Sequence, residues 1–150
     1  MFAAVNFAAR NGLAEASSEN DSPKQRARRT GIRGETFAYW YLRRHGYTLV
    51  ARNFTSPGIK GEIDMVGYDG PVLAFVEVKT RSANDPSLPK PEEAVNWEKR
   101  RNLSRMARQF LRARRIEESA CRFDILAIET RSGARPVVRL HKGAFGMGGE

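Results

Sequence analysis

Hydrophobic positions along the chain change between helical and alternating spacing, and each change marks an expected element. Residues 31–45 carry apolar side chains on one helical face, and Gly46 follows in the usual position of a helix end. That face consists of Phe37, Ala38, Tyr41 and Leu42. Residues 47–52 are rich in β-forming side chains and predict a strand, which a Ser-Pro-Gly loop at 56–58 follows.

The middle of the chain predicts a β-hairpin. Residues 62–68 and 72–79 have the pattern of strands, and they flank the turn dipeptide Asp69-Gly70. The expected elements after the hairpin are a long helix at 92–115 and two strands at 122–128 and 136–140, around a turn at 131–134. The order α-β-β-β-α-β-β predicts an α/β domain with a mixed central sheet flanked by helices.

The hairpin strands carry charges where a buried strand is usually apolar. A two-residue turn at Asp69-Gly70 places Asp64 opposite Phe75, and strand alternation then puts Asp64, Glu77 and Lys79 on one face. In that register Asp64 and Glu77 are diagonal neighbours, close enough to bind one cation. A slip of one residue would separate them, so this prediction depends on the register.

Two carboxylates beside apolar side chains are costly to bury without partners or a metal. An oxygen-rich site of this kind suits Mg²⁺ or Mn²⁺. Glu35 shares the apolar face of the first helix, and Lys99 lies between Val95 and Leu103 on the second. For each of these side chains two positions are possible. It reaches towards the sheet, or it lies at the margin of its apolar face and reaches solvent.

Composition favours a polyanionic partner in a reducing compartment. The 150 residues include 26 Lys plus Arg against 17 Asp plus Glu, which gives a net charge of +9. The single cysteine excludes an internal disulfide, and two histidines do not provide a structural zinc site, so we expect a cytoplasmic protein. No stretch approaches the length of a membrane span, and we expect no membrane association.

The second helix is strongly basic. Arg101, Arg105, Arg108 and Arg112 follow i, i+4, i+7, i+11 and form one stripe. With Lys99, they are our candidates for contacts to a phosphate backbone. The alternative is a solvated basic face that aids solubility.

Three motifs carry a resemblance to a known family: Gly31-x-x-Gly34-Glu35, Gly61-Glu62-Ile63-Asp64 and Phe75-Val76-Glu77-Val78-Lys79. They resemble the YraN-like family of uncharacterised bacterial proteins, a branch of the PD-(D/E)XK nuclease superfamily. The resemblance covers residues 31 to the end and implies a restriction-endonuclease-like αβββαβ core. It also implies that Asp64 and Glu77 bind the metal, that Lys79 positions the attacking water, and that Glu35 lies beside the metal.

We therefore expect a flexible tail at residues 1–29 and a nuclease-like domain at residues 30–150. The function implied is a Mg²⁺-dependent or Mn²⁺-dependent, structure-selective DNA endonuclease, with Glu35, Asp64, Glu77 and Lys79 as the catalytic residues. Branched DNA in repair or recombination is the substrate this resemblance suggests. The alternative is a non-catalytic nucleic-acid-binding protein that keeps the nuclease fold. A homodimer would suit symmetric cutting of a junction, although the sequence does not show one.

Overall fold

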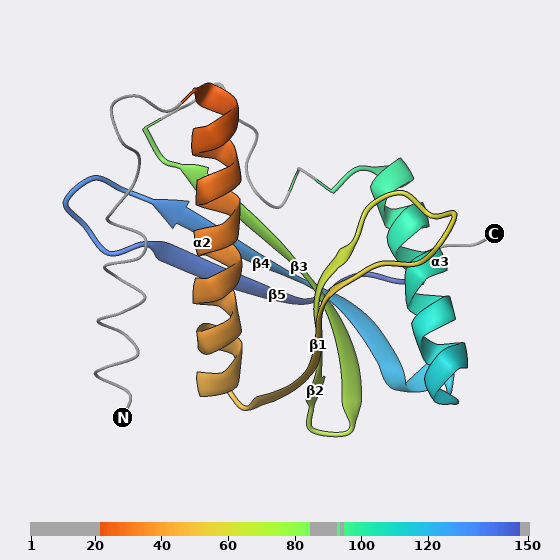
Figure 1. The fold of residues 1–150 in the computed structure, drawn as a ribbon. Helices are drawn as coiled ribbons and strands as arrows, with labels where there is room; N and C mark the ends of the chain where they lie inside the picture. The colour runs from red at the N-terminus through yellow and green to blue at the C-terminus, as the bar shows by residue number, and fades with distance from the viewer. Residues whose placement is uncertain (1–21, 85–92, 94, 148–150) are drawn as a thin grey trace.

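The computed structural model describes residues 22–84, 93 and 95–147, and these form a mixed sheet with a helix on each face (Figure 1). The elements in order are α2 (Pro23–Arg44), β1 (Tyr47–Phe54), β2 (Ile63–Asp69), β3 (Val72–Ser82), α3 (Trp97–Arg114), the short 3-10 helix η2 (Glu118–Ala120), β4 (Cys121–Thr130) and β5 (Val137–Phe145). Among the described residues the sheet has five strands in the order β1-β2-β3-β4-β5. Only the β3–β4 pair of this sheet is parallel. The expected α/β class and order of elements are confirmed.

Helix α2 begins earlier than the hydrophobic pattern predicted. Pro23 is its first residue, so residues 23–29, which we had assigned to the flexible tail, are helical. The Ser22 side chain accepts a hydrogen bond from Gln25 N, and the Gln25 side chain accepts one from Ser22 N. This capping box satisfies backbone N–H groups at the start of α2, so the helix can begin at residues that offer no apolar face. Residues 1–21 lie outside the described residues.

Helix α3 begins at Trp97 rather than at residue 92. The Asn96 side chain accepts a hydrogen bond from Lys99 N at 2.9 Å and caps the helix. Val95 therefore precedes the helix, although it is buried in the same core as the apolar face of α3. Arg115 has a left-handed backbone and ends the helix, as expected.

The two faces of the sheet bury separate cores. Val66, Leu73 and Phe75 pack with Phe110 and other residues of α3, so these three strand residues share a face. The opposite face buries Met65, Val76 and Ile128 against Ala38 and Leu42 of α2. Alternation along β2 and β3 therefore supplies one apolar layer to each helix.

The hairpin register differs from the prediction by two positions. Asp69 pairs with Val72, and Val66 pairs with Phe75, so Gly70 and Pro71 form the tip instead of Asp69 and Gly70. A shift of two leaves every side chain on its predicted face. Continuing the observed register by one pair sets Asp64 opposite Glu77, closer than the predicted diagonal.

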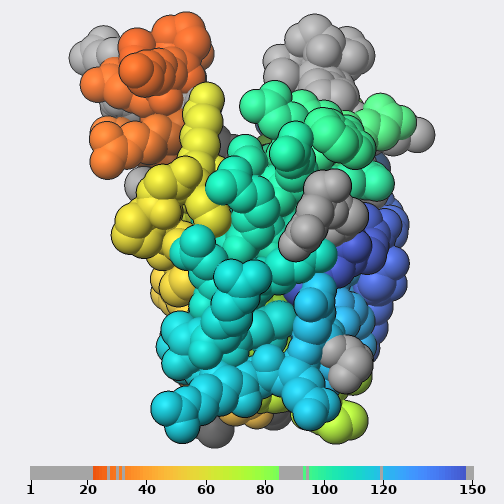
Figure 2. Space-filling view, turned by 90° about the vertical axis from the view of Figure 1, so that its right-hand side faces the viewer, coloured from red at the N-terminus to blue at the C-terminus, as the bar shows by residue number. Residues whose placement is uncertain are grey.

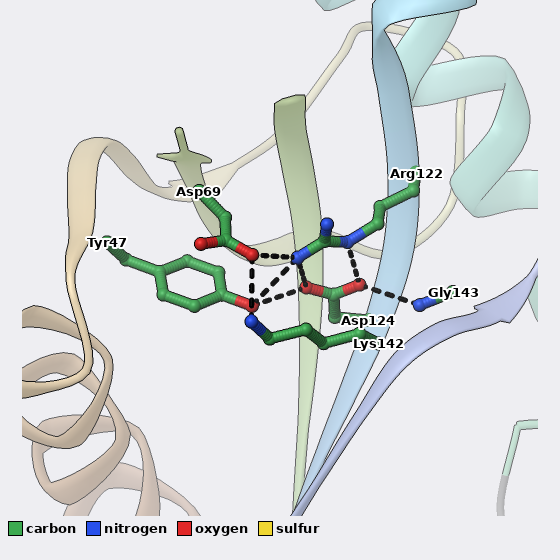
Figure 3. A network of polar contacts seen from close by, with 6 residues as sticks. All are labelled: Tyr47, Asp69, Arg122, Asp124, Lys142 and Gly143. Atoms are coloured by element: carbon green, nitrogen blue, oxygen red, sulfur yellow. Dashed lines mark hydrogen bonds and ion pairs between the residues drawn. The ribbon is translucent and has the colours of Figure 1, made fainter. Parts of the chain in front are cut away.

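A polar network holds the hairpin tip against the end of the sheet (Figure 3). Arg122 donates to Asp69 at 2.6 Å and to Asp124 at 2.8 Å, and Tyr47 donates to Asp124 at 2.8 Å. Lys142 bonds Asp69 at 2.9 Å. Asp124 is fully buried, and the Gly143 N–H also donates to it. The network therefore joins β1, β2, β4 and β5.

None of the helices in the described part of the chain is long and apolar enough to cross a membrane.

Candidate metal centre

Three acids from separate segments meet at the start of β2. Glu35 comes from α2, Glu62 from the loop before β2, and Asp64 from β2 itself. One carboxylate oxygen from each lies within 4.8 Å of the other two. Asp64 is buried, Glu35 is half-buried and Glu62 is exposed, so the group opens to solvent on one side.

Glu62 is the member that our sequence interpretation did not place in the site. The predicted hairpin makes Glu62 the first residue of a strand and gives it no role. The signal for it was present, because residues two apart in an extended segment point to the same side. Glu62 and Asp64 are related in this way.

Glu77 on β3 brings a fourth acid and two lysines. Its Oε1 atom lies 2.5 Å from Lys99 Nζ and 3.4 Å from Lys79 Nζ. Its Oε2 atom is buried and has no hydrogen-bond partner among the described residues. The sequence predicts Lys79 on the same face as Glu77, and the two side chains are in contact. Lys99 is also a candidate for phosphate contacts with the arginine stripe, but it reaches Glu77 from α3.

Burial and mutual repulsion raise the pKa values of two of the acids. Burial, followed by the charge of Glu77, raises the pKa of Asp64 to about 8, although the Val78 N–H donates to Asp64 at 2.8 Å and opposes the shift. Burial and then Glu62 raise the pKa of Glu35, while Arg52 lowers it. A proton or a metal ion would relieve this clustering of negative charge.

The two lysines are shifted in opposite directions. Burial and a contact with Lys99 lower the pKa of Lys79. Burial also acts to lower the pKa of Lys99, but the contacts with Glu77, together with those of Lys79 and the charge of Asp64, raise it overall. Lys99 is therefore the cation that neutralises Glu77, and Lys79 is the amine that gives up its proton more readily.

These donors fit a hard divalent cation. All four acids offer carboxylate oxygen, which is the ligand type that Mg²⁺ and Mn²⁺ prefer. The Glu77 Oε2 atom is buried and has no partner in the described part of the chain, as expected for an oxygen that completes its contacts only when a cation binds. The acids whose oxygens lie close enough together to share one ion are Glu35, Glu62 and Asp64. The predicted ligand Glu77 is not in this group, although its charge acts on Asp64 and Glu35.

The predicted arginine stripe lines a groove along α3, the helix that faces the viewer in Figure 2. The groove has a volume of about 360 Å³ and is lined by Ile59, Arg101, Ser104, Arg105, Arg108, Gln109 and Arg112. Arg108 also pairs with Glu118 at 3.2 Å. The four arginines therefore share one surface, as their spacing predicted.

A mixed sheet between two helices, with clustered acids and lysines beside it, defines an α/β domain with a candidate metal centre. The model of the uncharacterised protein family UPF0102 matches residues 34–128, which include every candidate acid and lysine of this centre. The chain belongs to this family, the family of YraN-like proteins.

Relatives from several bacteria share most of the chain. A UPF0102 protein of Koribacter versatilis is 43% identical over 132 residues, which is 88% of this chain and 88% of the relative. The Solibacter usitatus protein is 46% identical over 112 residues, 75% of this chain and 82% of its own. A Symbiobacterium thermophilum protein is 40% identical over 119 residues, which cover 79% of this chain and 98% of that relative.

Proposed function

We propose that this protein is a metal-dependent, structure-selective DNA endonuclease that hydrolyses phosphodiester bonds, with branched DNA as its substrate. The observation that supports this most is the buried Glu77 Oε2 atom, which lacks a partner among the described residues. The charge of Glu77 also raises the pKa values of Asp64 and Glu35. A divalent cation would satisfy that oxygen and neutralise the cluster.

The chain's own residues have distinct roles in this proposal. Asp64 and Glu77 hold the cation, and Glu35 lies beside it. A bound Mg²⁺ or Mn²⁺ supplies stabilisation of the charge that develops on the phosphoryl oxygens and acidifies water. Lys79 orients the attacking water, because its amine is next to Glu77 and its pKa is lowered. The arginine groove on α3 binds the backbone away from the cut.

The test is a cleavage assay with labelled single-stranded, duplex, flap and four-way-junction DNA in Mg²⁺, Mn²⁺ or EDTA. Wild-type protein is compared with Asp64→Asn and Glu77→Gln, which keep side-chain size. Cutting that needs metal and is lost in both variants supports the nuclease and identifies its preferred structure. Cutting that persists in both variants would assign the activity to a contaminant.

A non-catalytic nucleic-acid-binding protein is the second candidate. The observation that favours it is the pairing of Glu77 with both Lys79 and Lys99, which neutralises the acid without a metal. In that case no substrate is cut, and Glu77→Gln leaves DNA affinity nearly unchanged.

Sedimentation of the protein with and without a junction tests the further proposal that a homodimer addresses two strands.

A further inference from the structure

The first turns of α2 carry an unusual charge pattern for a helix start. The first turn reads Pro-Lys-Gln-Arg, so it is basic, and no acidic residue follows before Glu35. The amino end of a helix has partial positive charge and is stabilised by acidic side chains, so cations there oppose the helix dipole. A polyanionic partner would compensate for this arrangement.

Lys24 and Arg28 lie on the same line of the helix as the acid site. Positions 24, 28, 31 and 35 follow i, i+4, i+7, i+11, so Lys24, Arg28 and Glu35 share one stripe. The same stripe continues to Leu42, which is fully buried against the sheet. The helix face that covers the sheet therefore becomes basic on the N-terminal side of Glu35.

The path along this stripe is open. Position 31 is a glycine, and a Cβ atom placed there would meet nothing within 4 Å. Lys24 and Arg28 are both exposed. In Figure 1 these turns form the upper end of α2, and in Figure 2 they project at the upper left of the molecule.

The spacing along the helix suits a nucleic-acid strand. With a rise of 1.5 Å per residue, Arg28 is about 10 Å and Lys24 about 16 Å from Glu35 along the axis. A strand of B-DNA rises about 3.4 Å per nucleotide, so these distances span about three to five nucleotides. A phosphate in the acid site would therefore have neighbours within reach of both cations.

We propose that Lys24 and Arg28 form a basic arm that binds the DNA backbone three to five nucleotides from the phosphate held at Glu35 and Asp64. This inference rests on the proposed function for its choice of partner. The arm precedes residue 34, where the match to the family model begins, and it adds a second basic surface to the arginine groove of α3.

The test compares Lys24→Gln/Arg28→Gln with the matched control Arg26→Gln/Arg33→Gln. Both variants lose two charges, but positions 26 and 33 lie on the opposite side of α2 from Glu35. Affinity for duplex and four-way-junction DNA is measured in EDTA at several salt concentrations. The arm variant should bind about ten-fold more weakly, and its slope of log affinity against log salt should fall by about 2.

Unfolding does not produce the same result. Removing cations from the start of a helix relieves the dipole, so the arm variant should keep or raise its melting temperature. Equal losses in both variants would show that only net charge matters and would overturn the proposal, as would an unchanged salt slope in the arm variant.

The cleavage assay separates this outcome from the proposed function. If wild-type protein cuts no substrate but the arm variant alone loses affinity, the endonuclease proposal fails and the arm is supported. If wild-type protein cuts and the arm variant binds normally, the arm proposal fails and the endonuclease is supported.

Discussion

Two glycines three residues apart on α2 should respond to alanine in opposite directions. Gly34 is buried where α2 crosses β3, and a Cβ atom there would overlap Thr80 Oγ1 and lie 3.2 Å from Thr80 Cβ. Gly31 is exposed, and a Cβ atom there meets nothing within 4 Å. Both positions are helical, so alanine improves helix propensity at each.

The size of the effect follows from these contacts. Gly31→Ala should raise the free energy of unfolding by about 0.8–1 kcal/mol, the propensity difference between the two residues. Gly34→Ala gains the same amount but incurs overpacking against Thr80 that costs about 1–3 kcal/mol or more. Rotation of Thr80 can move Oγ1 but not Cβ, so we place the cost near the upper end of that range. The net result is a loss of about 1–2 kcal/mol.

Denaturant unfolding, with thermal melts as a second readout, measures both variants. The two alanine proteins should differ by about 2–3 kcal/mol, which is about 4–12 °C in melting temperature for a chain of this size. Thr80→Ala should recover part of the loss in the Gly34→Ala background, giving a coupling energy of about 1 kcal/mol. Stabilisation by both alanines would refute the close approach of α2 to β3.

The same pair tests how the acid site is held together. Glu35 follows Gly34, so pushing α2 away from β3 moves Glu35 away from Asp64 and Glu62. Gly34→Ala should therefore weaken Mn²⁺ binding, whereas Gly31→Ala leaves this contact intact. Equal Mn²⁺ affinity in both proteins would show that Glu35 does not contribute to the site.

Four further predictions concern the charges and the buried network. Burial and Glu77 raise the pKa of Asp64 to about 8, so Mn²⁺ binding should release a proton and its affinity should rise between pH 6 and pH 8. Calorimetry in two buffers measures both the affinity and the proton release. Asp64→Asn should remove the pH dependence of the affinity. The same group should make the metal-free protein less stable as pH rises from about 4 to about 8, because the folded chain holds a proton that the unfolded chain, with a pKa of 3.8, has released. Lys99→Gln removes the cation 2.5 Å from Glu77 Oε1, so Mn²⁺ should bind several-fold more tightly; weaker binding would contradict competition between lysine and metal. Tyr47→Phe deletes a hydroxyl that donates to Asp124 and accepts from Arg122. It should lower the free energy of unfolding by about 1–3 kcal/mol, measured by guanidinium titration. An unchanged midpoint would show that the Tyr47 hydroxyl does not stabilise the fold.

The order of elements was predictable because it depends on local patterns. Alternation in β2 and β3 and helical spacing in α2 and α3 are visible within windows of ten residues. The predicted hairpin register is wrong by two because the Asp-Gly pattern makes Asp69 a turn residue, whereas it pairs with Val72 in the structure. Its partners Arg122 and Lys142 are 53 and 73 residues away in the chain, and no local pattern shows that Asp69 completes the ladder.

The acid site was partly predictable for the same reason. Strand alternation placed Asp64, Glu77 and Lys79 on one face, and that conclusion survived the register error because the shift was even. The position of Lys99 was less accessible to sequence reasoning. Its place beside the apolar face of α3 was visible, but the choice between solvent and Glu77 depends on how far α3 lies from β3.

The charges of the molecule imply an order of binding events. The protein carries a net charge of +9, yet three acids gather at one point, and the charge of a fourth acid, Glu77, acts on two of them. Arginine and lysine attract a phosphate backbone at long range, whereas the carboxylates repel a phosphate at contact distance. Lys99 neutralises Glu77 but leaves Glu35, Glu62 and Asp64 without an equivalent ion pair among the interactions described above. Under the proposed function, metal-free protein should therefore bind DNA through its basic surfaces with the acid site set back from the backbone, and a divalent cation should bring one phosphate to the acid site.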